Sequence, residues 1–490
     1  MKKILLILLL ISMVITSCAT GGSSKAKSTD TNSNNANGEV TETVAEEGKE
    51  EYVYPDVDYN GEEFWMINVE PVWGYYPNLD FENMTGDILD DAVYQRNRLL
   101  EEKLNFTFKV KDVDIGQIYS QVRTLLTAGE DVYDAIMITG HEVYNLILEN
   151  MLYNLYDVPQ LNLEKDWWEQ TVLKTISYGN PPKAYFGSNY MNLFGFQSTY
   201  ITYFNESILE DLGLSMPYEY VDKGTWTFDV MHEQIKAGTS LNGDDSYKWS
   251  ADGNCVYGFS TYEQAQLAFM IGMGANFIEK DSSDYPYLAV DNERFYSICD
   301  KLAAFMGTEG EFLNANENSE SGWAFHYERI FAASRAFYIV GEIKASNTFR
   351  TMDDNFGILP MPKYDENQQE YRCNRLNQSL MVAIPITNPD VDRAGVVLET
   401  MAYQSFADVL PVFYDYTVSQ KGLRNEDSIR MMDIIRGSRY YDIGIGNGWT
   451  QSLVDSVSNL VRKGDSNVAS AIASQQEKIT ASIEKSMNIG

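Results

Sequence analysis

Near the start of the folded part of the chain, continuous apolar runs alternate with stretches in which apolar residues recur at helical spacing. The continuous runs lie at 64–69, 106–110 and 132–138 and predict buried strands. The stretches between them, at 86–105 and 118–128, predict amphipathic helices. Strand, helix, strand, helix, strand is the order that produces a parallel sheet with crossover helices.

The same alternation returns after residue 205. Thr227 precedes an amphipathic stretch that stops at Gly238, as an N-cap precedes a helix. Ser260 lies three residues before Glu263, which is the spacing of a capping box and predicts another helix start. Further strands are predicted at 198–204, 255–260, 334–340, 355–362 and 380–387. The pattern therefore predicts an α/β fold of two units joined by extended segments.

The amino-terminal pattern differs from the rest. A positively charged start and an aliphatic run at 4–11 are typical of a secretory signal, and the run is too short to span a membrane. The sequence "ITSC" resembles a bacterial lipobox, so we predict a signal peptide at 1–17 and a lipidated Cys18, with a plain signal and an incidental cysteine as the alternative. Residues 18–50 are polar and predict a disordered tether. We therefore expect a protein anchored by lipid to the extracytoplasmic face of the cell membrane.

Composition narrows the possible partners. The formal net charge of −34 argues against nucleic acid, whose phosphates would be repelled. Three cysteines follow Cys18, which allows at most one disulfide and leaves its existence open. The three histidines are far apart in sequence, so we expect no zinc site and no cofactor.

Open parallel sheets bind ligands in the loops that follow their strands. In this chain those loops are rich in aromatic and polar residues: Trp73 and Tyr75, His141 and Tyr144, Thr261 and Tyr262, and Glu342. We predict that these residues face one another across a cleft.

This mixture of residues suits a sugar. Trp and Tyr rings can pack on the C–H face of a pyranose, and side chains such as Asn189, Glu342 and Arg375 can bond its hydroxyls. For each aromatic residue the alternative is packing in the core, and His141 could simply cap its helix.

Several segments resemble the extracellular solute-binding proteins of ABC transporters, family 1, the carbohydrate-type class. They are "GDILDDAVYQRNRLLEEKLN", "YDAIMI", "YITYFNESILEDLGL", "GTWTFDVM", "FGILPMPKYDENQQEYR" and "VLETMAYQS". Together they run across almost the whole chain after the tether.

The resemblance implies a two-lobed fold of the periplasmic-binding-protein type II, with a mostly parallel sheet in each lobe and a hinge of several strands. Lobe one would comprise 51–200 and 361–410, and lobe two 205–356 and 411–490, with hinge segments near 200–205 and 356–361. The family often places a late aromatic residue at the cleft, which here is Trp449.

The function implied is that of a substrate-binding lipoprotein of an ABC importer. It would capture a sugar, with a preference for an oligosaccharide, between its lobes and deliver it to a membrane permease, without bond chemistry and as a monomer. Two alternatives remain open. A glycoside hydrolase would need a pair of carboxylates that nothing in the sequence selects, and a cell-surface glycan-binding sensor or adhesin would need no transporter.

Overall fold

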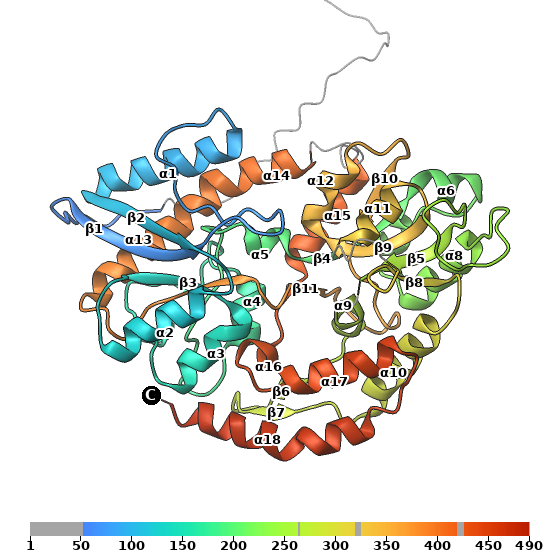
Figure 1. Cartoon of the computed structure of the whole chain (residues 1–490). Coiled ribbons are helices and arrows are strands. Elements are labelled where there is room, and N and C mark those ends of the chain that lie inside the picture. Colours follow the sequence, from blue (N-terminus) through green and yellow to red (C-terminus); the bar gives the residue numbers. More distant parts are fainter. Residues whose placement is uncertain (1–51, 263–264, 319–324, 419–425, 490) are drawn as a thin grey trace, which may run out of the picture. The chain divides into compact units, whose positions relative to one another are not determined.

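The structure is a computed structural model that describes residues 52–262, 265–318, 325–418 and 426–489 (Figure 1). The residues from Tyr52 onward form one compact unit. The predicted signal peptide, Cys18 and tether lie outside the described residues. Over the ranges described, no helix has the length and apolar character needed to cross a membrane.

The first of two larger sheets has four strands in the order β12-β3-β1-β2. Its strands are β1 (Glu62–Val69), β2 (Phe106–Val113), β3 (Ala135–Thr139) and β12 (Leu380–Ala383). β1 pairs in parallel with both β2 and β3, whereas β12 runs antiparallel to β3. The predicted strand–helix alternation is therefore confirmed, and a strand from much later in the chain completes the sheet.

Helices cover both faces of this sheet (Figure 1). They are α1 (Ile88–Leu104), α2 (Ile118–Ala128), α3 (Gly140–Leu148) and α13 (Val391–Gln404). Along β1, Phe64 and Met66 belong to the cluster formed with α1 and α13, while Ile67 and Val69 belong to the cluster formed with α2 and α3. Because successive strand residues point to opposite faces, a sheet covered on both sides requires a continuous apolar run.

The second large sheet has five strands in the order β10-β4-β9-β5-β8. They are β4 (Tyr200–Asn205), β5 (Tyr257–Thr261), β8 (Phe312–Asn314), β9 (Ala336–Glu342) and β10 (Phe356–Leu359). β5 pairs in parallel with β8 and β9, and β4 runs antiparallel to both β9 and β10. The two segments predicted as hinge crossings, 200–205 and 356–361, thus contain paired neighbouring strands.

The helices between these strands are α6 (Glu206–Asp211), α7 (Tyr218–Asp222), α8 (Phe228–Gly238), α9 (Ala265–Gly272), α10 (Glu293–Met306), α11 (His326–Ala332) and α12 (Ser346–Phe349), with the 3-10 turn η2 (Ile343–Ala345). Thr227 accepts a hydrogen bond from the backbone N–H of Val230, and α8 ends at Gly238, so both predictions are confirmed. The prediction that Ser260 caps a helix is wrong. β5 continues through Thr261, and the Ser260 hydroxyl donates to the carbonyl of Leu313 (3.3 Å).

Short elements join the two sheets. Two-stranded ribbons are formed by β6 (Ile278–Lys280) with β7 (Pro286–Leu288), and by β11 (Cys373–Asn374) with β13 (Arg439–Tyr440). The segment after β3 contains η1 (Leu155–Asp157), α4 (Gln170–Ile176) and α5 (Phe194–Gln197).

The carboxyl-terminal elements follow α13 and are η3 (Ser405–Val409), α14 (Leu410–Val418), α15 (Glu426–Gly437), α16 (Ile443–Gly446), α17 (Gln451–Arg462) and α18 (Ala469–Met487). α14 contacts α1 and α16 contacts α3, whereas α15 contacts β10 and α17 contacts α9 and α10. The segment 411–490 therefore divides its contacts between helices of both sheets. The assignment of the chain to two lobes with those boundaries stays a prediction.

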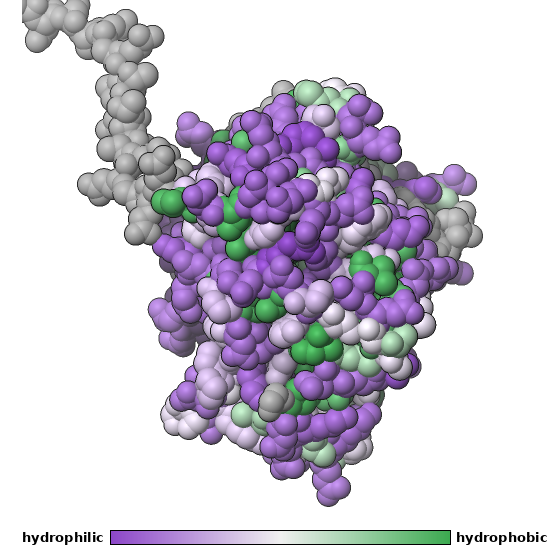
Figure 2. All heavy atoms as spheres, turned by 90° about the vertical axis from the view of Figure 1, so that its left-hand side faces the viewer, coloured by the Kyte–Doolittle hydropathy of each residue, from purple (hydrophilic) through white to green (hydrophobic). Residues whose placement is uncertain are grey.

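The face drawn in Figure 2 is mostly hydrophilic, with hydrophobic side chains in small separate patches. This agrees with the large excess of acidic residues over basic ones, 71 against 37. Isolated apolar residues of this kind are normal on a protein surface.

A buried carboxylate ties the β11–β13 ribbon to α4. Glu169 accepts from Arg375 (Nη1, 2.8 Å) and Arg439 (Nη1, 2.7 Å), and also from the Ser188 hydroxyl (2.9 Å). Burial alone would raise the pKa of Glu169, but the two guanidinium groups and the hydroxyl outweigh it, and the pKa is lowered. Glu169 is therefore charged and fully paired in the interior.

Replacing this carboxylate should destabilise the fold strongly. Glu169→Gln leaves two buried guanidinium groups without a counter-charge, so we expect the free energy of unfolding to fall by about 3–5 kcal/mol. Urea unfolding followed by circular dichroism measures the change. Glu149→Gln is the control, because Glu149 pairs with Arg123 at the surface and should be nearly neutral. Equal losses for the two variants would contradict this role.

A second buried carboxylate, Asp442, should make stability depend on pH. Burial raises its pKa from the usual 3.8 to about 6, against the lowering effect of backbone N–H groups and Arg372. The folded state thus holds the proton more tightly than the unfolded state, and its stabilising contribution is lost as pH rises from 4 to above 6. Since one pKa unit corresponds to about 1.4 kcal/mol, the loss amounts to roughly 3 kcal/mol.

We expect Asp442→Asn to remove this dependence, because the amide stays neutral and its oxygen can still accept from Ile445. Thermal unfolding of the unsubstituted protein and of Asp442→Asn at a series of pH values between 4 and 7 measures how stability depends on pH in each. Asp465→Asn, at an exposed position, serves as the control. If the melting temperatures of the unsubstituted protein and of Asp442→Asn changed with pH in parallel, Asp442 would not be the source of the pH dependence.

Candidate ligand-binding site

A cavity of about 400 Å³ lies where elements of the two sheets meet. Its walls come from the start of β4, from α9, from β11 with the following loop 376–378, and from one face of α17. β4 and α9 belong to the second sheet and its helices, whereas the loop leads directly into β12 of the first sheet. The lining therefore combines elements of the second sheet with a loop that leads into the first sheet.

The lining is polar and rich in amides. Six of the thirteen lining side chains are amides: Gln266, Asn374, Asn377, Gln378, Gln451 and Asn459. Asp455 and Arg462 contribute one charge of each sign, and Arg462 also faces Glu317 (3.6 Å). A lining with balanced charge and many amides suits an uncharged ligand that both donates and accepts hydrogen bonds.

Several lining atoms have hydrogen-bonding capacity left over. Among the residues that the structure describes, the buried Nδ2 of Asn374, Oε1 of Gln378, Oε1 of Gln451 and Oγ of Ser458 lack a protein partner. Buried polar atoms are normally bonded, and leaving one unbonded costs about 1–3 kcal/mol. These four atoms belong to residues that line the cavity, and their hydrogen-bonding capacity is not used within the described part of the protein.

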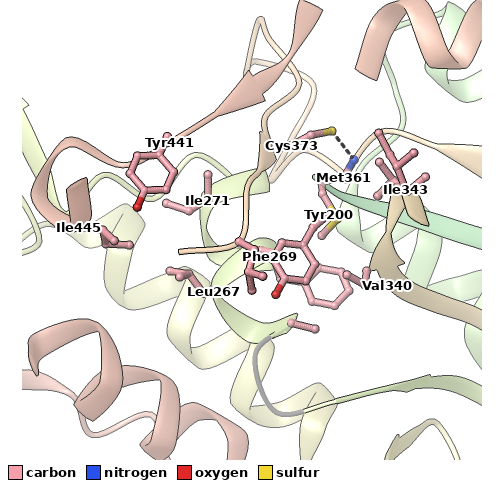
Figure 3. Close-up of a cluster of buried hydrophobic side chains, with 14 of the residues drawn as sticks. Tyr200, Leu267, Phe269, Ile271, Val340, Ile343, Met361, Cys373, Tyr441 and Ile445 are labelled. Carbon is pink, nitrogen blue, oxygen red and sulfur yellow. Dashed lines mark hydrogen bonds between the residues drawn. The ribbon is translucent and has the colours of Figure 1, made fainter. Parts of the chain in front are cut away.

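Tyr200 forms the aromatic part of the wall. Figure 3 shows it within the buried cluster that also contains Leu267, Phe269 and Val340. Tyr200 is 2% exposed and lines the cavity together with Leu267, while its hydroxyl is hydrogen-bonded to the hydroxyl of Tyr262.

Behind Tyr200 lies a group of hydroxyls around one carboxylate. The Tyr262 hydroxyl donates to Oε1 of Glu342, and the Tyr327 hydroxyl donates to Oε2 (2.8 Å). Tyr75, from the loop after β1, lies beside the same carboxylate. Four tyrosines of this region, Tyr75, Tyr200, Tyr262 and Tyr327, have pKa values well above the usual one. The main cause is burial, and the second is the charge of Glu342. All four hydroxyls are therefore protonated at neutral pH.

The ring of Tyr75 is held by further contacts. It packs on Phe194 (centroids 4.3 Å apart), and the ammonium of Lys344 lies 5.2 Å from its centre. Lys344 also pairs with Glu328 (3.3 Å), which bonds Thr348 as well. The loop after β1 of the first sheet is thereby joined to the end of β9 in the second.

The structure brings three of the sequence-predicted residues together: Tyr75, Tyr262 and Glu342. Thr261 lies next to them but donates its hydroxyl to the carbonyl of Val340 (2.9 Å). Trp73 lies apart at the tip of a turn and is 45% exposed, with a φ of 53° that a bulky residue rarely adopts. Whether any of them contacts a ligand stays a prediction.

A second group lies around α3. His141 is half-buried near the start of this helix, and burial lowers its pKa. Gly448 lies against the ring of Tyr144, so closely that a Cβ at position 448 would be 2.1 Å from it. The adjacent Trp449 packs on Tyr178 and donates its indole N–H to Ser486 (2.8 Å). Trp449 is thus engaged in the packing of α18.

Asn189 and Arg375 are directed into the interior. Arg375 is fully buried against Glu169, and Asn189 accepts from the backbone N–H of Met191 (3.0 Å). None of the ten sequence-predicted residues is among those that line the cavity.

The residues that line the cavity are close neighbours of the predicted ones, and strand geometry explains the difference. Successive residues of an extended chain point to opposite sides, so Asn374 faces the cavity while Arg375 faces Glu169. On α17, Gln451, Asp455 and Ser458 lie on one helical face at spacings of four and three. That polar stripe is visible in the sequence and was the signal that could have identified this wall.

Comparison with known proteins identifies the fold of the chain. No known family model matches the chain, and no curated protein matches it significantly. Solved structures do match. A sugar transporter protein from Rhizobium etli in an open conformation has a TM-score of 0.57 at 12% identity, covering 86% of this chain and 99% of its own.

Two further solved structures are similar to the same extent. UspC of M. tuberculosis has a TM-score of 0.55 at 12% identity, covering 86% of this chain and 100% of its own. The ABC substrate-binding protein Lmo0181 from Listeria monocytogenes, in complex with cycloalternan, has a TM-score of 0.54 at 11% identity, covering 86% and 99%. At such identities the likeness concerns the fold, and the chain has the two-lobed α/β fold of the ABC-transporter solute-binding proteins.

Proposed function

We propose that this protein is an extracytoplasmic substrate-binding lipoprotein of an ABC importer and that it captures an uncharged sugar in the amide-lined cavity. The observation that carries the proposal is a polar cavity with unbonded buried donors and acceptors, lined by elements of the second sheet and by a loop that leads into the first, within a solute-binding fold. Each sugar hydroxyl can donate and accept, which matches this lining.

The electrostatics of the cavity support an uncharged ligand. With one acidic and one basic lining residue, Asp455 and Arg462, an ionic ligand would find no net charge of opposite sign. Among structures of the same fold, one is a cyclo/maltodextrin-binding protein in complex with maltotetraose, at 10% identity and a TM-score of 0.53.

Delivery to a permease and anchoring through Cys18 complete the proposal. Anchoring is supported by the sequence, where a lipobox-like "ITSC" precedes a polar tether. A closed arrangement of the two halves around the ligand would be the form presented to the permease, since a ligand that contacts both halves favours the closed state. The proposed role requires no covalent chemistry by this chain.

Sugar binding should be visible as a thermal shift. A ligand that binds only the folded state adds RT ln(1 + [L]/Kd), which is about 2.7 kcal/mol at a hundredfold excess over Kd, so the midpoint of residues 52–490 should rise by several degrees. Differential scanning fluorimetry with D-glucose, maltose and maltotetraose measures it and ranks mono- against oligosaccharides.

Spermidine and a neutral tripeptide are the comparison ligands. A shift with either of these and with no sugar would contradict the carbohydrate assignment. Chromatography of the sugars after incubation separates binding from hydrolysis, since cleavage products would favour a glycoside hydrolase. Unchanged sugar uptake after deletion of the gene would favour a sensor or adhesin.

Asn374→Ala should separate binding from stability. Asn374 is 1% exposed and its Nδ2 has no partner in the described structure, so truncation removes a ligand contact at little cost to the ligand-free fold. We expect about 3- to 10-fold weaker binding of the best sugar of the panel, as one hydrogen bond contributes about 0.5–1.5 kcal/mol. Isothermal titration calorimetry measures the affinity.

Asn388→Ala is the matched control. Asn388 is also buried, but it lies outside the cavity and makes two internal hydrogen bonds, to the carbonyl of Asp134 (2.7 Å) and from the N–H of Asp390 (2.8 Å). We expect Asn388→Ala to lower the melting temperature and to leave the affinity for the sugar unchanged. If Asn388→Ala weakened sugar binding and Asn374→Ala did not, the ligand would have to bind outside this cavity.

A further inference from the structure

The two charged residues of the cavity lining, Asp455 and Arg462, are each bonded to a neighbouring amide of the same lining. Oδ1 of Asp455 accepts from Nε2 of Gln451 (2.8 Å), and Nη2 of Arg462 donates to Oδ1 of Asn459 (3.1 Å). Both pairs lie on α17, at spacings of four and three residues, where side chains of one helical face meet. The charges of the lining are thus used to bond amides of the protein itself.

The bond between Gln451 and Asp455 decides which end of the amide is which. A carboxylate only accepts hydrogen bonds, so the end of the amide that meets Asp455 has to be its nitrogen. With the amide turned over, two acceptor oxygens would face one another. The oxygen of Gln451 is therefore at the opposite end, where it is buried and has no partner within the described part of the chain.

The remaining buried capacity of the lining is richer in acceptors than in donors. Besides Oε1 of Gln451, Oε1 of Gln378 is an unbonded acceptor, whereas Nδ2 of Asn374 is a donor and the hydroxyl of Ser458 can serve as either, all within the residues described. A ligand hydroxyl can donate to such an acceptor, but an ether oxygen or a fluorine in its place cannot. The lining thus distinguishes neutral ligands by their donors.

We propose that Asp455 is a positioning residue, which holds the Gln451 amide with its oxygen toward the cavity and so makes the site select a ligand that donates a hydroxyl hydrogen at this point. Analogues in which that hydroxyl is replaced by a group that only accepts are rejected. The selection of the ligand rests on the proposed function, whereas the orientation of the amide does not.

The orientation is tested on the full-length, ligand-free protein in detergent. Glutamine side-chain amides labelled with ¹⁵N are observed by nuclear magnetic resonance, and the signal that is missing in Gln451→Ala identifies Gln451. We expect Asp455→Lys to shift this signal, because a lysine donates and attracts the oxygen end of the amide. Asp455→Asn keeps an oxygen acceptor and should leave the signal close to its original position. No shift in Asp455→Lys, or equal shifts in both variants, would overturn the role of Asp455.

The selection is tested with maltose and its monodeoxyfluoro analogues, in each of which fluorine replaces one hydroxyl, by isothermal titration calorimetry. For the unsubstituted protein we expect at least one analogue to bind about 5- to 100-fold more weakly than maltose, because a buried acceptor is left unbonded. In Asp455→Lys the same analogue and maltose should bind within about 2-fold of each other, as expected when the paired contact is absent. Asp455→Asn should retain the discrimination.

Glu477→Lys is the matched control, since it makes the same change of charge at an exposed position on α18 outside the lining. It should leave both the Gln451 signal and the discrimination unchanged. Equal binding of maltose and all analogues to the unsubstituted protein, or undiminished discrimination in Asp455→Lys, would overturn the selection. Failure of maltose to bind the unsubstituted protein would count against the proposed function, and the ligand-free spectra would still decide whether Asp455 holds the amide.

Discussion

Glu169 lies between the guanidinium groups of Arg375 and Arg439, and these three residues come from three distant parts of the chain. Through them the β11–β13 ribbon is fastened to the start of α4. A buried ion pair of this kind adds little net stability relative to an apolar contact, because desolvation offsets the attraction. Its consequence is positional, since both arginines bond the same buried carboxylate in the observed register of the ribbon.

The cavity depends on that register. Asn374 precedes Arg375, so fixing the arginine side chain on one side of the strand directs the amide to the other. The loop 376–378 continues from the ribbon into β12 and supplies further amides. The ion pairs of Glu169 thus fix which side of the ribbon faces the cavity, and a shift by one residue would exchange the amide of Asn374 for a charge.

Tyrosine residues occur both in the wall of the cavity and around the buried carboxylate of Glu342. Tyr200 lines the cavity and its hydroxyl bonds that of Tyr262, while the hydroxyls of Tyr262 and Tyr327 donate to Glu342. A carboxylate in this environment is stabilised by hydrogen bonds in place of a cation, and Lys344 is paired with Glu328 instead. A few of the chain's 33 tyrosines therefore have a structural role in this region.

The sequence by itself determined the elements, because helix and strand periods are local properties that burial of one or two faces imposes on neighbouring residues. β1, α1, β2, α2 and β3 appear where the apolar pattern predicts them, and Thr227 caps α8. Ser260 shows where local patterns fail as predictors. Its spacing to Glu263 is that of a capping box, but the residue is part of β5 and its hydroxyl bonds the carbonyl of Leu313.

Only the tertiary structure decided which side chains meet. Tyr75, Tyr262 and Glu342 were predicted individually from their places after strands, and their convergence follows from how the two sheets lie. The amides of the cavity were missed because Asn374 and Gln451 lie 77 positions apart and no local pattern joins them. Contacts between distant segments depend on the packing of whole sheets, whereas the sequence records only the period and the chemistry of each segment.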